Sequence, residues 1–340
     1  MYESFFGLKE PPFQLTPNPR FLFLTAAHRE ALATLRYGLT SSLGITLLLG
    51  EAGTGKTTLL TAALLAERRP KDRIAVLSNP TLAPADFYEI LADRFELPEG
   101  SAAKGRFLLA FERDLLERHR AGGGTAIVID EAQSLTHELF EEIRLLANLE
   151  TATAKLVNVV LVGQPELAER LNDPSLRQLK QRIILRCELA PLSLKGTASY
   201  IAARLRVAGA TPTEVFTKDA VGAIHDASHG IPRTIGVLCE NALLAGYAAQ
   251  SKPVGKAMVI DVCRDLDLPV DGRPPRAEGA AQHTGAASPK RQAAGEPPTR
   301  RAVSRVWIAS PSREPGPAAA DEDGPESPAA AERPRMFKFF

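Results

Sequence analysis

One glycine-rich stretch limits what this chain can fold into more than any other. Residues 50–57, Gly-Glu-Ala-Gly-Thr-Gly-Lys-Thr, match the pattern G-x-x-x-x-G-K-[ST] at every fixed position. The apolar run 45–49 before it predicts a short buried strand, and the Leu- and Ala-rich run 58–67 after it predicts a helix. A strand, a glycine-rich loop and a helix in this order indicate a parallel α/β fold with the loop at the end of its first strand.

The residue types in this loop suit the binding of a polyphosphate. The glycines let the backbone curve closely round phosphate oxygens, and the amides at the start of the following helix face the same oxygens. Lys56 adds a positive charge for the β- and γ-phosphates, and the Thr57 hydroxyl is a Mg²⁺ ligand in this geometry. The alternative, a chance glycine-rich turn, is opposed by the flanking strand and helix. The expected nucleotide-binding residues are Gly50, Glu51, Ala52, Gly53, Thr54, Gly55, Lys56, Thr57 and Thr58.

Composition narrows the classes of protein that remain. The chain has 340 residues and is 44% hydrophobic, which allows one large or two modest domains with a sizeable core. The formal net charge of +1 gives no support to nucleic-acid binding, although a local basic patch stays open. The three cysteines lack C-x-x-C spacing and are expected to be reduced packing residues of a cytosolic protein. We expect no signal peptide and no membrane helix, because no apolar run approaches the roughly 18 residues that a span needs.

Further apolar runs alternate with helical patterns along the chain. The run 125–129 is a continuous apolar stretch, as expected for a parallel strand covered on both faces. The predicted strands after the first are 73–77, 125–129, 156–162 and 183–186, and the helices between them include 26–40, 84–95, 106–120 and 136–149. The fold class is therefore α/β, a three-layer αβα sandwich with a parallel sheet.

An acidic pair ends the run 125–129. Asp130 is expected to hold Mg²⁺ through water, and Glu131, one residue further out, to orient and polarise the attacking water. The alternative is an exposed acidic pair at a strand end. A position after the third strand, downstream of the phosphate-binding loop, favours the functional interpretation.

Polar residues at the next strand ends complete the expected site. Gln164 follows the run 156–162 and would sense the γ-phosphate or position the water, against the alternative of a turn-capping amide. Arg182, and second Arg177, lie just before the last strand, where an arginine finger would sit, and a solvated basic helix end is an equal alternative.

After about residue 192 the strand pattern stops. Helices are predicted at 195–208, 218–228, 233–250 and 256–265, which together make a small helical lid. Arg233 begins one of them after a Gly-Ile-Pro break and would swing onto the γ-phosphate as the lid closes, against the alternative of a surface arginine at a helix start.

These changes of pattern give the expected domain organisation. An arm at 1–25 is rich in Phe and Pro; its aromatic side chains either pack the arm onto the domain or line the adenine pocket, and its prolines oppose regular helix. Residues 26–191 form the nucleotide-binding domain and 192–268 the helical lid. Residues 269–340 are Pro- and Ala-rich and are expected to be disordered, with a Phe-rich tip that either docks on a partner or has no role.

Other motifs are missing from the sequence. There is no Asn-Lys-x-Asp guanine-reading motif, so ATP is favoured over GTP. The six histidines lack metal-binding spacing, and no Ser-His-Asp set suggests itself. The expected cofactors are ATP and Mg²⁺.

Together these motifs resemble those of the AAA+ ATPases. More narrowly, three stretches resemble the ExeA/GspA family (general secretion pathway protein A), which includes the ATPases of exopolysaccharide and PEP-CTERM/exosortase loci. They are Tyr-Glu-Ser-Phe-Phe-Gly-Leu at 2–8 with Pro-Phe at 12–13, Leu-Val-Gly-Gln-Pro-Glu-Leu at 161–167, and Gly-Ile-Pro-Arg at 230–233. The resemblance covers about residues 1–268. Secretion-type members continue with a membrane helix and a periplasmic peptidoglycan-binding part, where this chain has only its polar tail.

The resemblance implies an ATPase that drives conformational change in an envelope-associated secretion or exopolysaccharide-export assembly. It also implies a homo-oligomeric ring and a cytoplasmic location, with peripheral association at the inner membrane left open. A DNA-associated, transposition-type ATPase (TniB/TnsC-like) is the alternative. Nucleic acid is not favoured as a partner, because the chain lacks a basic tail and a helix-turn-helix. A third option, a nucleotide-gated scaffold with negligible turnover, is opposed by the presence of Glu131.

Overall fold

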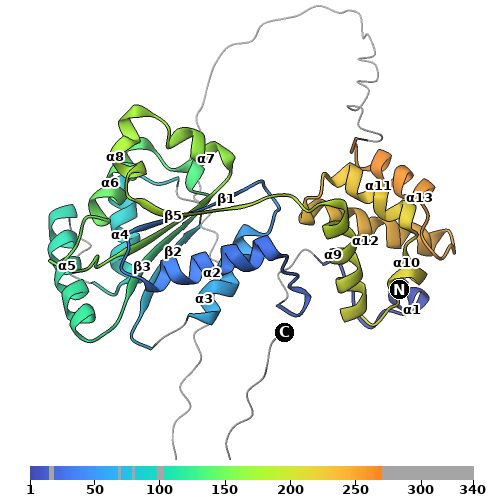
Figure 1. Ribbon diagram of the computed structural model, residues 1–340, viewed down its shortest axis with the longest axis horizontal. Coiled ribbons are helices and arrows are strands. Elements are labelled where there is room, and N and C mark those ends of the chain that lie inside the picture. Colours follow the sequence, from blue (N-terminus) through green and yellow to red (C-terminus); the bar gives the residue numbers. More distant parts are fainter. Residues whose placement is uncertain (15–18, 68–69, 79–80, 98–102, 270–340) are drawn as a thin grey trace, which may run out of the picture. The chain divides into compact units, whose positions relative to one another are not determined.

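The computed structural model describes residues 1–14, 19–67, 70–78, 81–97 and 103–269. At its centre lies a five-stranded parallel sheet with the strand order β2-β3-β4-β1-β5 (Figure 1). The strands are β1 Ile45–Gly50, β2 Arg73–Ser78, β3 Thr125–Asp130, β4 Asn158–Gly163 and β5 Ile183–Leu189. Because all strands run the same way, the residues that follow β1, β3 and β4 meet at one edge of the sheet.

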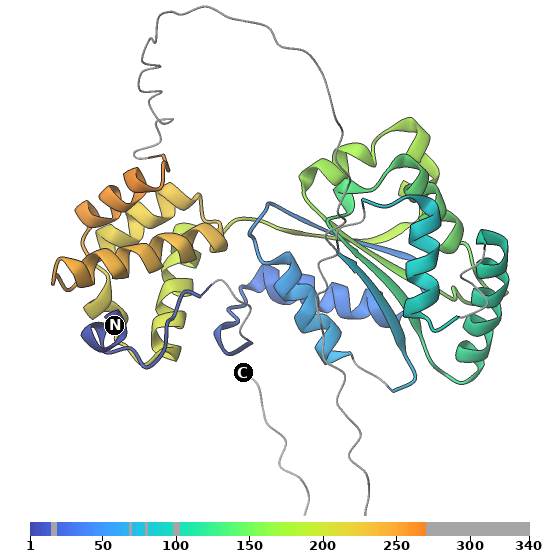
Figure 2. The ribbon, with the colours of Figure 1, turned by 180° about the vertical axis from the view of Figure 1, so that it is seen from behind.

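Helices cover both faces of the sheet, which confirms the predicted α/β fold with a parallel sheet. Successive side chains of β1 enter different hydrophobic clusters: Leu47 and Leu49 face α4–α8, and Leu48 faces α2 and α3 (Figures 1 and 2). The three inner strands are buried along their whole length, as strands covered on two faces should be. The helices are α2 Ala26–Thr40, α3 Lys56–Ala66, α4 Pro84–Arg94, α5 Lys104–Arg120, α6 His137–Leu146, α7 Pro165–Arg170 and α8 Arg177–Lys180.

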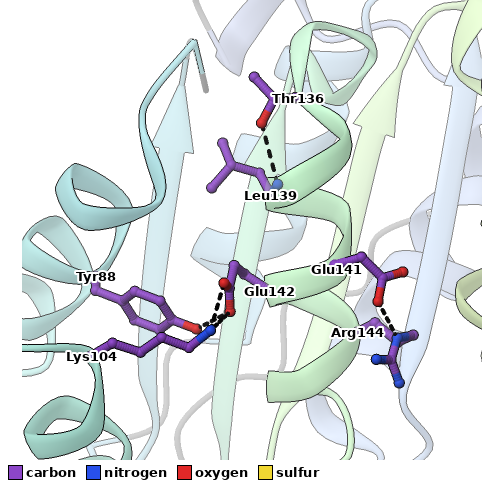
Figure 3. A network of polar contacts seen from close by, with 7 residues as sticks. All are labelled: Tyr88, Lys104, Thr136, Leu139, Glu141, Glu142 and Arg144. Atoms are coloured by element: carbon purple, nitrogen blue, oxygen red, sulfur yellow. Dashed lines mark hydrogen bonds and ion pairs between the residues drawn. The ribbon is translucent and has the colours of Figure 1, made fainter.

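A polar network fastens three of these helices to one another. The Tyr88 hydroxyl of α4 donates to Glu142 of α6 at 2.5 Å, and the Lys104 ammonium of α5 donates to both carboxylate oxygens of Glu142 at 2.6 Å (Figure 3). Burial, followed by the bond to Glu142, raises the pKa of the Tyr88 hydroxyl. Thr136 caps α6 by accepting from the Leu139 amide at 3.3 Å (Figure 3). Helix α6, which follows β3 closely, is thus held at its start by the Thr136 cap and near its middle by the contacts of Glu142.

A second group of helices has a hydrophobic core of its own. These C-terminal helices are α9 Leu194–Val207, α10 Pro212–Val215, α11 Lys218–Ser228, α12 Pro232–Ala248 and α13 Lys256–Asp265. Their core also contains residues from the start of the chain, including α1 Tyr2–Phe6. The Phe5 and Tyr247 rings lie 5.9 Å apart between centroids, and the Tyr2 hydroxyl donates to Glu240 at 2.6 Å. The N-terminal segment therefore packs on the C-terminal helices.

Some element boundaries differ from those that the sequence predicts. Helix α1 was not predicted. It can form because it ends before the first proline, Pro11, and proline disfavours helix only at and after that position. The short helices α7 and α10 were also missed; each has a proline in its first turn, where the absent N–H costs nothing. The predicted helix 136–149 ends at Leu146, and β5 continues three residues beyond the predicted 183–186.

The predicted tail, 269–340, lies outside the described residues except for Pro269. No helix among the described residues combines the length and the apolar character needed to cross a membrane.

Two residues of α5 allow a matched test of this packing. Phe111 is fully buried, with its ring centroid 4.9 Å from that of Phe95 and 5.1 Å from that of Phe107. Phe111→Ala should therefore lower the free energy of unfolding by about 3–5 kcal/mol. Leu109 is 67% exposed on the same helix, so Leu109→Ala should change it by no more than about 0.5 kcal/mol. Urea unfolding followed by circular dichroism measures both, and equal losses would contradict the assigned core.

Candidate functional site

The phosphate-binding loop, residues 50–57, joins β1 to α3 and takes a shape that glycine makes possible. Gly53 and Gly55 have φ angles of 82° and 97°, in the left-handed region that side chains disfavour. Gly50 is packed so closely that a Cβ there would lie 2.9 Å from the Leu189 carbonyl oxygen. Because α3 begins at Lys56, its first free amides belong to the loop.

Lys56 places a nearly buried cation in the middle of the loop. Its side chain is 5% exposed, and its Nζ donates to the carbonyl oxygens of Gly50 at 2.8 Å and Glu51 at 3.0 Å. Burial lowers the pKa of the Lys56 ammonium, and the nearby carboxylates, led by Glu131 and Asp130, oppose that change by favouring the charged form.

Thr57 and Asp130 form an oxygen-rich pair beside this cation. The Thr57 hydroxyl donates to Asp130 Oδ2 at 2.8 Å, while Asp130 Oδ1 accepts from the Glu131 amide at 3.0 Å. Hydroxyl and carboxylate oxygens are hard ligands of the kind that Mg²⁺ prefers. Within the described ranges no three His, Cys, Asp or Glu side chains cluster as a metal cage, so an ion here would take its other ligands from water and phosphate. The pair fits Mg²⁺ bound in that way.

Two amides hold the carboxylate of Glu131. Its Oε2 accepts from Gln133 Nε2 at 2.5 Å and from Gln164 Nε2 at 3.3 Å. Glu131 has a φ of 56°, an uncommon conformation for a residue with a side chain and one that recurs at functional sites. Gln164 precedes α7 but makes no side-chain capping bond there, so its amide serves Glu131 rather than the turn.

A cavity of about 480 Å³ opens over the loop and extends toward aromatic side chains. Its walls include the loop, Glu131, and the start of α12 at Arg233. The Arg233 amide donates to the Gly53 carbonyl oxygen at 3.2 Å, which attaches α12 directly to the loop. Further along, Phe13, Phe21, Phe23 and Tyr200 line the cavity.

His28 connects helix α2 to the loop. It is 8% exposed; its Nδ1 lies 2.6 Å from the Thr25 hydroxyl, and its ring bonds the Thr54 backbone. Burial lowers the pKa of His28, and the bond to Thr54 opposes this in part. The imidazole is therefore neutral near pH 7 and supports the loop through its bond to the Thr54 backbone.

The structure brings most of the predicted site residues together and leaves one apart. The loop, Asp130, Glu131, Gln164 and Arg233 all lie at the carboxyl edge of the sheet or on the cavity. Arg182 precedes β5 at the opposite edge, where its carbonyl oxygen accepts from the Ile45 amide at 3.3 Å. Five residue steps of β1 separate Ile45 from Gly50, which is about 17 Å of strand. Arg182 thus lies far from the loop of its own chain.

Two residues of this site were not predicted from the sequence. Gln133 lies two positions after Glu131, and that spacing is a signal that could have drawn attention to it. His28 carries no such signal, because nothing near it in the sequence indicates that it meets Thr54.

The chain is similar to proteins of a known family and to solved structures. A family model described as an AAA domain matches residues 39–171. General secretion pathway protein A of Aeromonas hydrophila is 44% identical over 255 residues, which are 75% of this chain and 46% of that protein. The chain therefore spans about half the length of the curated relative it matches.

Solved structures share the fold at low sequence identity. The ORC2 protein of Aeropyrum pernix, in ADPNP-ADP complexes, has a TM-score of 0.54 at 16% identity, covering 76% of this chain and 74% of that one. Drosophila ORC bound to DNA has a TM-score of 0.57 at 20% identity, covering 75% and 64%. Cdc6p of Pyrobaculum aerophilum has a TM-score of 0.51 at 19% sequence identity, and the match covers 74% of this chain and 68% of that one.

The lowered pKa of His28 gives stability a defined dependence on pH. In the unfolded chain His28 takes up a proton near its ordinary pKa of 6.5, while the folded chain resists protonation until a lower pH. Its contribution to stability is therefore complete above about pH 6.5 and is lost as the pH falls toward the lowered folded value. His28→Gln should melt with a shallower loss of Tm between pH 7 and 5 than the wild type. The exposed His119→Gln serves as the control and should keep the wild-type slope; equal slopes in all three proteins would contradict the assignment.

Proposed function

Because the chain belongs to the AAA+ ATPases related to general secretion pathway protein A, we propose that it hydrolyses ATP with Mg²⁺ and thereby drives conformational change in an envelope-associated secretion or exopolysaccharide-export assembly. The observation that carries the chemistry is one cavity lined by the loop with its Lys56 cation, by Glu131 and by Arg233. The pathway rests on the relationship to the secretion protein, whose length this chain spans only in part.

Each side chain has a role in the proposed reaction. The loop amides and Lys56 bind the β- and γ-phosphates, and Thr57 with Asp130 holds Mg²⁺, which neutralises phosphate charge when bound. Glu131 orients the attacking water and accepts its proton. Gln164 and Arg233 contact the γ-phosphate. Its loss therefore removes a contact at the start of α7 and another in the first turn of α12. Hydrolysis would then alter the attachment of α12 to the loop.

The apolar end of the cavity is proposed to take the adenine. Phe13, Phe21, Phe23 and Tyr200 give this end of the cavity an aromatic lining that suits a flat base. The phosphate-binding loop and these aromatic side chains line one cavity, and this supports ATP as the ligand. The likeness to DNA-bound ORC is one of fold alone, so it adds nothing to a DNA-associated function.

We also propose that the protein works as a homo-oligomeric ring. Arg182 lies at the sheet edge opposite its own loop, so it can act as an arginine finger only on a neighbouring subunit.

The proposed location is the cytoplasm, close to the inner membrane, because ATP is supplied there and the relative belongs to a secretion pathway.

Two substitutions separate binding from hydrolysis. Lys56→Ala should abolish ATP binding, because the loop loses its cation. Glu131→Gln should bind ATP with near wild-type affinity yet hydrolyse it about 100-fold or more slowly, because only water activation is lost. Fluorescent-nucleotide titration and phosphate release measure the two effects. Wild-type turnover by Glu131→Gln would show that another group is the base.

Arg182→Ala tests the ring. It should keep ATP affinity within a few-fold but lower hydrolysis by roughly 10³, the scale of an arginine finger supplied in trans. Mixing it with Lys56→Ala subunits should restore part of the activity, since each subunit supplies what the other lacks. Arg264→Ala, an exposed arginine on α13, is the matched control and should behave as wild type. Activity per subunit that is independent of concentration, with no rescue in the mixture, would exclude a trans role, and Arg177 would then be tested.

A further inference from the structure

Gln133 lies between two residues of the proposed catalytic site. Its Nε2 donates to Glu131 Oε2 at 2.5 Å, and its Oε1 accepts from the Gln164 backbone amide at 3.2 Å. Its own carbonyl oxygen accepts from the guanidinium of Arg170, the last residue of α7. Both the side chain and the main chain of Gln133 are thus fixed by hydrogen bonds.

The direction of these bonds follows from chemistry. A backbone N–H only donates, so the Gln133 atom that faces Gln164 has to be the oxygen. The NH₂ group then faces Glu131, where an ionised carboxylate accepts it. An amide flipped by 180° would place two donors together at Gln164 and two acceptors together at Glu131. Gln133 is therefore held in one orientation by partners on both sides.

These contacts anchor one oxygen of Glu131 and leave the other available. Oε2 takes both amide donors, whereas within the described part of the chain no group hydrogen-bonds to Oε1. Glu131 lines the cavity over the loop. We propose that Gln133 is a positioning residue, which fixes Oε2 so that Oε1 faces the attacking water. This inference rests on the proposed role of Glu131 as the base.

The local backbone explains why such an anchor is needed. Glu131 leaves β3 in a left-handed conformation and enters a single 3₁₀ turn, Ala132–Ser134, so no regular helix or strand fixes its side chain. A free glutamate side chain has several rotatable bonds and samples many positions. A general base has to be held close to its productive geometry by supporting hydrogen bonds. Gln133 supplies one of these supporting hydrogen bonds, and its own carbonyl oxygen is bonded by Arg170. The Arg170 guanidinium in turn lies 5.1 Å from the centroid of the Phe140 ring.

The first test is kinetic. Gln133→Leu keeps much of the side-chain volume and removes the donor, so kcat should fall about 100-fold, the cost of a misplaced reacting group. The Kd for ATP should stay within about twofold, because no phosphate contact is lost. Gln133→Glu keeps an acceptor for Gln164 but turns a second carboxylate toward Glu131, and should lose at least as much kcat. Ser134→Ala, which alters an exposed neighbour, should leave both constants unchanged.

A double-mutant cycle and a nucleotide-free measurement complete the design. In a Glu131→Gln background, Gln133→Leu should add little further loss, because no base remains to be positioned. In the absence of nucleotide, the side-chain amide resonances of Gln133 should differ between the wild type and Glu131→Ala. The comparison is made by ¹⁵N-resolved NMR. This readout does not depend on turnover, and melting curves verify that each variant folds.

The outcomes separate this inference from the proposed function. Wild-type kcat in Gln133→Leu together with an inactive Glu131→Gln would overturn the positioning role and leave the base intact. Full activity of Glu131→Gln would overturn both. Parallel losses of kcat, ATP affinity and melting temperature in Gln133→Leu would indicate a structural role instead, and a rise in kcat would mean that Gln133 restrains Glu131. A Gln133 amide resonance insensitive to Glu131→Ala would show that the contact is absent.

Discussion

The buried ammonium of Lys56 is the interaction on which the site depends. A cation removed from water is unfavourable unless neighbouring groups replace its hydration. The carbonyl oxygens of Gly50 and Glu51 replace part of it directly, and the carboxylates of Asp130 and Glu131 contribute opposite charge. The loop can close round Lys56 only because its glycines accept left-handed backbone, and the acidic pair can lie beside it only because β3 delivers it there.

Sheet topology makes that delivery possible. With β4 between β3 and β1, the residues after three strands gather at one edge, and the pairing of Ile129 with Leu161 brings Glu131 and Gln164 to neighbouring positions. Residues far apart in the sequence therefore share one carboxylate. On one face of the sheet, the bond from Tyr88 to Glu142 joins α4 to α6, the helix that follows β3.

The features that could be predicted from the sequence are those whose pattern lies in adjacent residues. The strand, loop and helix around 45–66 carry their pattern in adjacent residues, so the fold class and the cluster of loop, acidic pair and Gln164 could be predicted together. His28 and Gln133 escaped, because their partners Thr54 and Gln164 are reached only through tertiary structure. The same holds for the N-terminal aromatics: their composition left packing and lining of the adenine pocket open, and no local pattern identifies α12 and its neighbours as the surface against which they pack.

The packing of the N-terminal segment on the C-terminal helices has a mechanical consequence. The chain joins those helices to the sheet layers twice, once between Phe13 and α2 and once between β5 and α9. A shift of these helices against the sheet layers therefore has to be accommodated in both connections at once, and it also strains the bond between the Arg233 amide and the Gly53 carbonyl oxygen.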